Sequence, residues 1–308
     1  MGPPNVSSVY FDLKKVYCKL FLKLNGMSEL HQRKPDWLKI KLPKGTNFTQ
    51  VKSIVQRYNL HTICTSGKCP NMGECWAAGT ATLMILGDVC TRSCKFCATK
   101  TGKPLPVDAN EPSNVAESIR LMGLKHAVLT SVDRDDLPDK GAGHWAATIK
   151  DVKRVNPETT MEVLIPDFDG EPNLIGLVVD ARPDIISHNL ETVRRLTPLV
   201  RSRAKYDVSL KVLKTIADSG VVPKSGIMLG LGETREEVLE TMDDLLRVGC
   251  KVFTIGQYLQ PTKEHLPVEA YVHPDVFEEY RQIGLAKGFK NVESAPLVRS
   301  SYHAERHV

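Results

Sequence analysis

The chain has 308 residues, of which 42% are hydrophobic and 25% are charged, so it can bury a large core and is not globally disordered. A single β/α barrel of this length is as ordinary as two average domains. The net charge of +5 is too mild to indicate a nucleic-acid-binding protein, and the absence of a long apolar run excludes a membrane span.

The first 34 residues carry a basic amphipathic pattern. Their apolar side chains recur at helical spacing, while most of the lysines fall elsewhere. The apolar positions are Leu13, Val16, Tyr17, Leu20 and Leu24. No arginine precedes Arg33 and serines are few, which argues against a mitochondrial presequence. We therefore expect residues 1–34 to be an N-terminal extension of a cytoplasmic protein, with an organelle matrix as the alternative location.

Six of the eight cysteines form two groups of three in one part of the chain. The groups are Cys64, Cys69 and Cys75, followed by Cys90, Cys94 and Cys97. Disulfides are disfavoured because the chain shows no cleavable secretory signal and is large enough to fold on its core. Zinc is disfavoured because only one C-x2-C pair is present. Two four-iron clusters, each held by three thiolates, suit the arrangement better, and each would keep one iron open to another ligand. The remaining cysteines, Cys18 and Cys250, have no partner spacing and are predicted to be non-ligands.

From about residue 80 onward, short apolar strands alternate with amphipathic helices. Strands are predicted at 80–86, 127–132, 161–166, 185–189, 226–229 and 252–257. Apolar residues at helical spacing predict one helix after residues 112–113. A second helix is predicted after Thr234 and Glu237, which have the pattern of a capping box. Alternation of this kind predicts an α/β fold, a partial six-stranded parallel β/α barrel with right-handed crossovers.

The first strand leads directly into the Cys90 group, which places that loop at the carboxyl ends of the strands, where barrel chemistry occurs. Residues 130–131 and 189–191 end later strands at the same edge. We expect four regions: the extension 1–34, a cluster-binding cap 35–79, the barrel 80–288 and a C-terminal tail 289–308.

Residues 90–97 read CTRSCKFC, with Phe96 at the aromatic position. This resembles the C-x3-C-x-aromatic-C signature of the radical S-adenosylmethionine superfamily. The resemblance implies that the open iron binds the amino and carboxylate groups of S-adenosylmethionine. Its reductive cleavage yields a 5′-deoxyadenosyl radical that removes hydrogen from an unactivated carbon, so the cofactor carries the hard chemistry.

A closer resemblance, to the lipoyl synthase family, extends from about residue 35 to 304. It rests on residues 64–76 (CTSGKCPNMGECW), on the tail 299–304 (RSSYHA), and on the segments 128–137, 188–192 and 257–262. It implies insertion of sulfur at the sixth and eighth carbons of an octanoyl chain that is amide-linked to a lysine of a carrier protein. The sulfur atoms would come from an auxiliary [4Fe-4S] cluster.

The resemblance also assigns ligands and contacts. Cys90, Cys94 and Cys97 would hold the cluster that binds S-adenosylmethionine. The auxiliary cluster would be held by Cys64, Cys69, Cys75 and Ser301, whose oxygen is a harder ligand than thiolate. Ser300 is the alternative to Ser301, and an ordinary turn is the plain alternative for both. Expected contacts of S-adenosylmethionine are Phe96, Thr130, Ser131, Asn189, Glu191, Gly230 and Gly232.

Several of these residues have plainer explanations. Polar residues at strand ends also cap helices, and the glycines of 226–233 also suit a tight strand-to-helix turn. Lys68 and Arg92 lie inside the cysteine loops, where they would either support a cluster, by offsetting its charge or donating hydrogen bonds to sulfur, or remain solvated.

The expected partners are octanoylated lipoyl carrier domains, namely 2-oxoacid dehydrogenase acyltransferase subunits and the glycine cleavage H protein. A reductant such as flavodoxin or ferredoxin and a cluster-assembly carrier are also expected, with no nucleic acid and no membrane. The alternatives are another sulfur-inserting radical enzyme, such as a biotin synthase or a methylthiotransferase, an iron–sulfur electron carrier, and a structural zinc protein.

Overall fold

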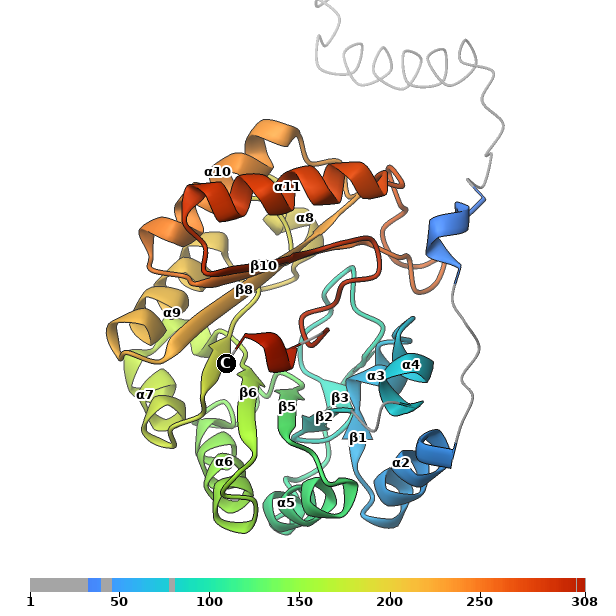
Figure 1. The fold of residues 1–308 in the computed structure, drawn as a ribbon. Helices are drawn as coiled ribbons and strands as arrows, with labels where there is room; N and C mark the ends of the chain where they lie inside the picture. Colours follow the sequence, from blue (N-terminus) through green and yellow to red (C-terminus); the bar gives the residue numbers. More distant parts are fainter. Residues whose placement is uncertain (1–32, 40–45, 78–80, 303, 308) are drawn as a thin grey trace, which may run out of the picture. The chain divides into compact units, whose positions relative to one another are not determined.

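The computed structural model describes residues 33–39, 46–77, 81–302 and 304–307 (Figure 1). Two compact units are distinguished, Met1–Asp36 and Trp37–Val308, and the second contains the sheet and every expected ligand. The predictions for the amphipathic segment and for Cys18 lie outside the described residues. Across the described ranges, no helix has the length and apolarity needed to cross a bilayer.

One eight-stranded sheet organises the second unit, in the order β1-β2-β5-β6-β7-β8-β9-β10. Neighbouring strands from β2 to β10 are parallel, and only β1 is antiparallel to its neighbour. The strands are β1 His61–Thr62, β2 Thr82–Ile85, β5 His126–Ser131, β6 Thr160–Leu164, β7 Ile185–Ser187, β8 Val222–Leu229, β9 Val252–Gln257 and β10 Asn291–Ser294. Two short strands, β3 Val89–Cys90 and β4 Lys100–Thr101, pair separately.

The parallel α/β architecture is confirmed, but the predicted number of six strands is wrong for this sheet. All six predicted strands are present as β2 and β5 to β9, which form its middle. The two additional strands lie at the edges, in segments that were expected to be only cap and tail. β1 has two residues and β10 has four, and strands this short produce almost no periodic signal.

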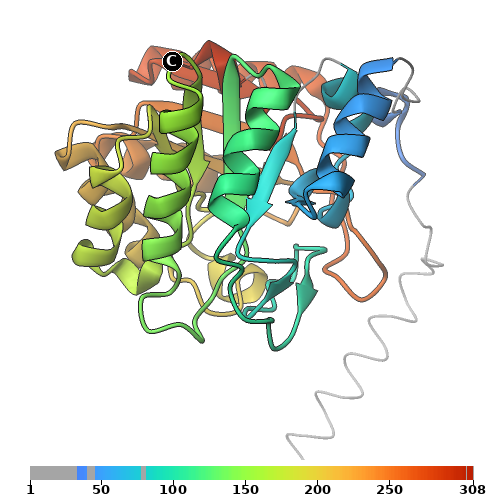
Figure 2. The same ribbon diagram turned by 90° about the horizontal axis from the view of Figure 1, so that it is seen from below.

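Helices cover the outer side of the curved sheet (Figures 1 and 2). The longer ones are α2 Thr46–Arg57, α5 Glu111–Met122, α6 Ala142–Val155, α7 Pro172–Asp180, α9 Tyr206–Asp218, α10 Arg235–Arg247 and α11 Pro274–Lys287. The short ones are η1 Asp36–Leu38, α3 Ile63–Ser66, α4 Met72–Ala77, η2 Phe168–Gly170, α8 Thr197–Val200 and η3 Ala304–Arg306. The predicted capping box is confirmed, because the Thr234 side chain accepts from the Glu237 backbone and the Glu237 side chain accepts from the Thr234 backbone.

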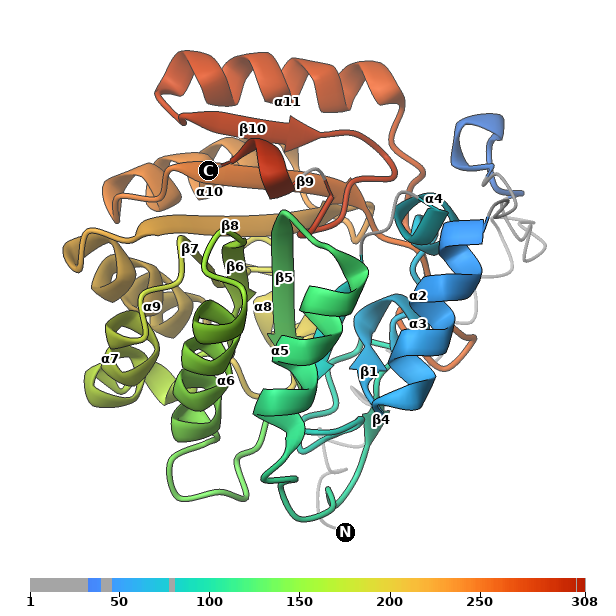
Figure 3. The same cartoon turned by 60° about the horizontal axis from the view of Figure 1, so that its bottom comes forward.

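Apolar faces of these helices pack on the sheet in two clusters. One joins β2, β5 and β6 to α5 and α6 and includes the fully buried Trp145. The other joins β8, β9 and β10 to α10 and α11, with α11 lying over β10 at the sheet edge (Figure 3). Burial of each large apolar side chain contributes about 1.5–3 kcal/mol, so the strand positions that precede the cysteine loop are rigidly held.

Candidate functional site

The first cysteine group follows β2 at the carboxyl edge of the sheet, with Cys90 at the end of β3 and the other two on the loop after it. Backbone N–H groups of Arg92 and Asp133 point at Cys90 Sγ, at 3.4 and 3.3 Å. Burial, and then the charge of Asp133, raise the pKa of the Cys90 thiol to about 12. The thiol is therefore protonated without a metal, and a metal that binds it must displace the proton.

Cys94 and Cys97 complete this group. The backbone N–H of Cys97 donates to Cys94 O at 3.2 Å, which folds the loop back on itself. Burial, together with the charges of Cys94 and Glu191, raises the pKa of the Cys97 thiol. Phe96, between them in sequence, packs on the apolar cluster of β8 and β9. The loop therefore presents three thiols while its aromatic residue anchors it to the core.

Arg92 ties the cysteine loop to neighbouring strand ends. Its side chain is buried, and Nε and Nη2 each donate to Asp135 at 2.8 Å. Nη2 also lies 2.8 Å from Asp167 Oδ1, and Nη1 lies 3.4 Å from Asp133 Oδ1. Of the two expectations for Arg92, solvation is wrong, and the guanidinium is neutralised by aspartates at the ends of β5 and β6. These aspartates were missed because nothing in sequence spacing links them to a cysteine loop.

The polar residues at the ends of β5 and β7 have different surroundings. Thr130 Oγ1 donates to Leu164 O at 3.3 Å, and Ser131 Oγ accepts from Trp145 Nε1 at 3.2 Å. Asn189 Nδ2 donates to Ser300 Oγ at 2.7 Å, whereas its Oδ1 is buried with no partner among the described side chains and backbone. A buried unsatisfied acceptor is costly, so this oxygen suits the donor group of a bound molecule.

Glu191 follows Asn189 and lies near Cys97. Its φ of +69° is in the left-handed region, which side chains other than glycine and asparagine rarely adopt. Burial raises the pKa of its carboxyl group. A strained, half-buried carboxyl group beside a thiol is typical of a functional site.

The glycines after β8 are explained by the fold itself. Gly230 and Gly232 have φ of +95° and +98°. A side chain at Gly230 would place its Cβ 2.2 Å from Gln257 Nε2 and 2.4 Å from Ala270 O. The plainer explanation, a tight strand-to-helix turn, is therefore sufficient for both positions, and a role towards S-adenosylmethionine stays a prediction.

The second cysteine group lies on α3, on α4 and on the turn between them. Burial raises the pKa of the Cys64 and Cys69 thiols, and the two lie close enough for Cys69 to contribute to the raised pKa of Cys64. Over the described ranges, no three His, Cys, Asp or Glu side chains converge as ligands of a single metal ion. Ligands of a four-iron cluster bind different irons and need not converge in this way.

The C-terminal tail lies against this second group. Asn71 Nδ2 donates to Leu297 O at 2.7 Å, and Tyr302 Oη donates to Glu74 Oε1 at 3.5 Å. Ser301 lies between these contacts in sequence, next to Ser300, which Asn189 holds. Segments more than 220 residues apart in sequence are thus brought together, as a serine ligand requires.

Arg299, in the same tail, was not singled out from the sequence. Its Nη1 donates to Val298 O at 2.6 Å, and its charge acts on Cys69 to lower the pKa of that thiol against the larger effect of burial. The signal was present in the tail motif, where an arginine precedes the two serines. Its cationic side chain suits an anionic group at Cys69.

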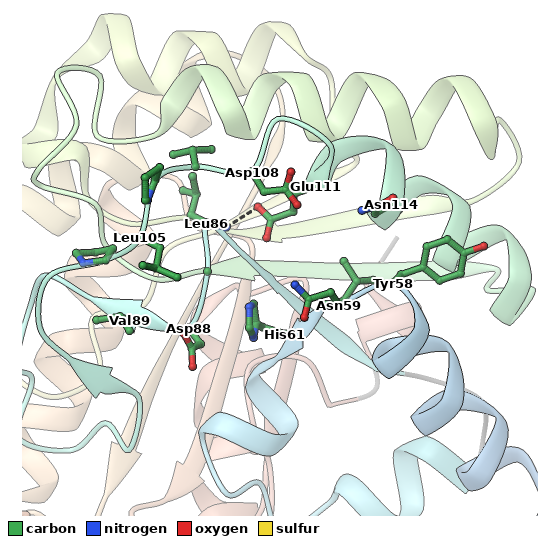
Figure 4. Close-up of a pocket in the computed structure, with 15 residues that line it drawn as sticks. Tyr58, Asn59, His61, Leu86, Asp88, Val89, Leu105, Asp108, Glu111 and Asn114 are labelled. Atoms are coloured by element: carbon green, nitrogen blue, oxygen red, sulfur yellow. Dashed lines mark hydrogen bonds between the residues drawn. The ribbon is translucent and has the colours of Figure 1, made fainter.

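A cavity of about 140 Å³ lies apart from the thiols (Figure 4). It is bordered by the end of α2, by β1 and by the loops around Leu86 and Leu105. Glu111 closes one side, where its Oε2 accepts from the Leu86 N–H at 2.8 Å. No cysteine lines the cavity, so it carries none of the expected chemistry.

Comparison with known proteins agrees with the cysteine pattern. The family model described as the radical SAM superfamily matches residues 84–245, and the N-terminal domain of lipoyl synthase matches residues 16–69. The chain is 69% identical over 278 residues to a lipoyl synthase of Parabacteroides distasonis, covering 90% of this chain and 99% of that one. It is 64% identical over 283 residues to a lipoyl synthase of Treponema denticola, covering 92% of this chain and 98% of that one.

Solved structures share the fold at low identity. Methylornithine synthase (PylB) gives a TM-score of 0.52 at 11% identity, covering 77% of this chain and 73% of that one. The hydrogenase maturase HydG gives a TM-score of 0.55 at 12% identity, covering 80% of this chain and 63% of that one. Superfamily membership implies a [4Fe-4S] cluster and S-adenosylmethionine, and the relatives indicate a sulfur-inserting radical enzyme. The chain belongs to the radical S-adenosylmethionine superfamily and, within it, to the lipoyl synthase family.

Proposed function

We propose that this protein inserts one sulfur atom at the sixth and one at the eighth carbon of an octanoyl chain amide-linked to a lysine of a lipoyl carrier protein. The observation that carries the proposal is the presence of two separate cysteine groups, one on the loop after β2 and one beneath the C-terminal tail. When bound and reduced, the first cluster and S-adenosylmethionine supply a radical that removes hydrogen from each carbon, and the second cluster supplies the sulfur.

Cys90, Cys94 and Cys97 would hold the first cluster. Their loop fits this role because two backbone N–H groups already point at Cys90 Sγ, and N–H donors stabilise cluster-bound thiolate. The unsatisfied Asn189 Oδ1 fits a donor of S-adenosylmethionine. The further contacts that we propose for this cofactor are Phe96, Thr130, Ser131, Glu191, Gly230 and Gly232.

Cys64, Cys69, Cys75 and Ser301 would hold the second cluster. The chemistry of this donor set fits, because three thiols and one hydroxyl supply four ligands for four irons. Arg299 adds a positive charge near Cys69, which would balance the net negative charge of a thiolate-bound cluster. We also propose that residues 35–79 act as the cluster-bearing cap and residues 289–308 as the tail.

The substrate arrives on another protein, so the edge that bears the first cluster must admit a long arm. Lys95 and Lys263 are exposed there, on segments tied together by a hydrogen bond between His265 Nε2 and Cys97 O at 2.9 Å. This charge would favour acidic carriers such as acyltransferase lipoyl domains and the glycine cleavage H protein. A flavodoxin or ferredoxin as reductant, a cluster-assembly carrier and a cytoplasmic location complete the proposal.

The test is an anaerobic reaction of the reconstituted, reduced protein with S-adenosylmethionine and an octanoyl-lysine peptide. Mass spectrometry is expected to show 5′-deoxyadenosine and a peptide carrying two added sulfur atoms. Formation of 5′-deoxyadenosine with no sulfur in the peptide would contradict the substrate assignment. A protein that cleaves no S-adenosylmethionine on reduction would instead favour an electron carrier.

A further inference from the structure

A buried ion pair inside the curved sheet has no place in the chemistry described above. Lys224 on β8 and Glu162 on β6 are both 0% exposed, with Nζ 2.8 Å from Oε2. Ser187, on the strand between them, donates to Glu162 Oε1 at 2.9 Å. A buried ion pair is costly unless the remaining hydrogen-bonding groups are also satisfied.

A further partner of Lys224 comes from the end of the chain. His307 is 1% exposed, and its Nδ1 lies 3.1 Å from Lys224 Nζ. An ammonium group only donates, so Nδ1 must accept and the ring proton must be on Nε2. Nε2 lies 3.8 Å from Glu293 Oε1. The imidazole is therefore neutral in this contact, and the last described residue docks on a buried lysine.

The docking position lies at the amino ends of the strands, away from the cysteine loop. Seen down the barrel in Figure 1, η3 lies within the ring of strands, and Figure 2 shows the C-terminus at the end of the strands opposite the β3–β4 loop. Lys224 is near the amino end of β8, whereas the Cys90 group follows the carboxyl end of β2. The tail thus runs from the second cysteine group to the amino ends of the barrel strands.

The tail has a second fixed point upstream of the serines. Val298 is buried, and its backbone N–H donates to Ala295 O at 3.0 Å directly after β10. Ser300 and Ser301 are therefore in a short segment held at Val298 on one side and, beyond the 3.5 Å contact of Tyr302 with Glu74, at His307 on the other. A ligand on a segment fixed at both ends has a higher local concentration at its target than one on a free end.

We propose that His307 is a positioning residue, which docks the tail on Lys224, the partner of Glu162, and thereby keeps Ser301 beside the Cys64–Cys75 group. The proposal rests on the proposed function, because it takes Ser301 as a ligand of the second cluster. A hydroxyl oxygen is a poorer ligand than thiolate for a sulfide-bound iron, so it dissociates readily and depends on being returned to the same place.

The test measures iron retention by the second cluster in the full-length chain. Cys90, Cys94 and Cys97 are replaced by alanine so that only the second cluster is reconstituted, and transfer of iron to a ferrous chelator is followed by absorbance. His307→Ala is expected to raise the rate of iron release about tenfold, the factor for loss of one hydrogen bond to a charged group. His307→Asn, whose Oδ1 replaces Nδ1 as acceptor, is expected to restore the parent rate. Arg306→Ala, an exposed neighbour, is the matched control and is expected to change nothing.

Hydrogen exchange of the backbone amides between residues 298 and 307 checks the anchor without any iron. His307→Ala is expected to exchange faster than the parent and than Arg306→Ala. An unchanged rate of iron release in His307→Ala overturns the proposal, even if hydrogen exchange is faster, because docking of His307 would then have no effect on ligation by Ser301. Equal release by His307→Asn and His307→Ala also overturns it. If the triple cysteine variant binds no iron at all, the second cluster of the proposed function is refuted and the proposal is refuted with it.

Discussion

Arg92→Ala removes a buried guanidinium that holds the cysteine loop against the ends of β5 and β6. Nε and Nη2 make hydrogen bonds of 2.8 Å to Asp135, and Nη2 lies 2.8 Å from Asp167. Burial alone would raise the pKa of Asp167, but the hydrogen bond and charge of Arg92 outweigh it and hold that pKa at about 2, against an ordinary 3.8. The substitution leaves these buried carboxylates without their cation.

The expected loss in the free energy of unfolding follows from these contacts. The lowered pKa of Asp167 corresponds to about 2–3 kcal/mol, at roughly 1.4 kcal/mol for each pKa unit. Hydrogen bonds between charged groups such as those to Asp135 contribute about 1.5–3 kcal/mol each, and loss of one partner of a buried ion pair costs roughly 3–5 kcal/mol. We therefore expect Arg92→Ala to lower the free energy of unfolding by roughly 3–5 kcal/mol.

Urea unfolding of the metal-free protein at pH 7 measures this loss. Arg120→Ala, which removes an exposed pair with Glu117 on one helix, is the matched control and is expected to change nothing measurable. Because the pKa of Asp167 is lowered on folding, its contribution is present above its ordinary pKa of 3.8 and is lost as the pH falls towards 2. The difference between parent and Arg92→Ala is therefore expected to shrink over that window. A loss below about 1 kcal/mol at pH 7, or a difference independent of pH, would refute the reasoning.

Three further substitutions address separate elements. Cys69→Ala is expected to abolish sulfur insertion while 5′-deoxyadenosine still forms, as measured by mass spectrometry; retained insertion would contradict its role as a ligand. Gly230→Ala is expected to lower the free energy of unfolding by more than 1 kcal/mol, because its Cβ would lie 2.2 Å from Gln257 Nε2, and an unchanged urea midpoint would show that the turn is adaptable. Thr234→Ala removes the helix cap and is expected to cost about 1 kcal/mol; no change on urea unfolding would mean that solvent replaces the cap.

The sequence predicts the centre of the sheet better than its edges. The middle strands are apolar runs flanked by amphipathic helices, so β5 and β9 appear within a residue or two of their expected bounds. β1 and β10 depend instead on pairing with neighbours that are already in place. Such short edge strands are decided by tertiary contacts rather than by local pattern.

The same distinction applies to the site. The two cysteine groups are evident from spacing, because the cysteines within each group are close in sequence. The partners of Arg92 and the contact of Asn71 with Leu297 join residues that are far apart in the chain. The geometry of these contacts is determined by the packing of the sheet, so no pattern in a single sequence predicts it.

The claim that two clusters share this polypeptide is tested most directly by elemental analysis of protein reconstituted and purified without oxygen. Iron and acid-labile sulfide are expected at about eight atoms each per chain, falling to about four when Cys64, Cys69 and Cys75 are replaced together. About four atoms of each in the parent protein would contradict the account, because one cubane cannot both generate the radical and give up its sulfur.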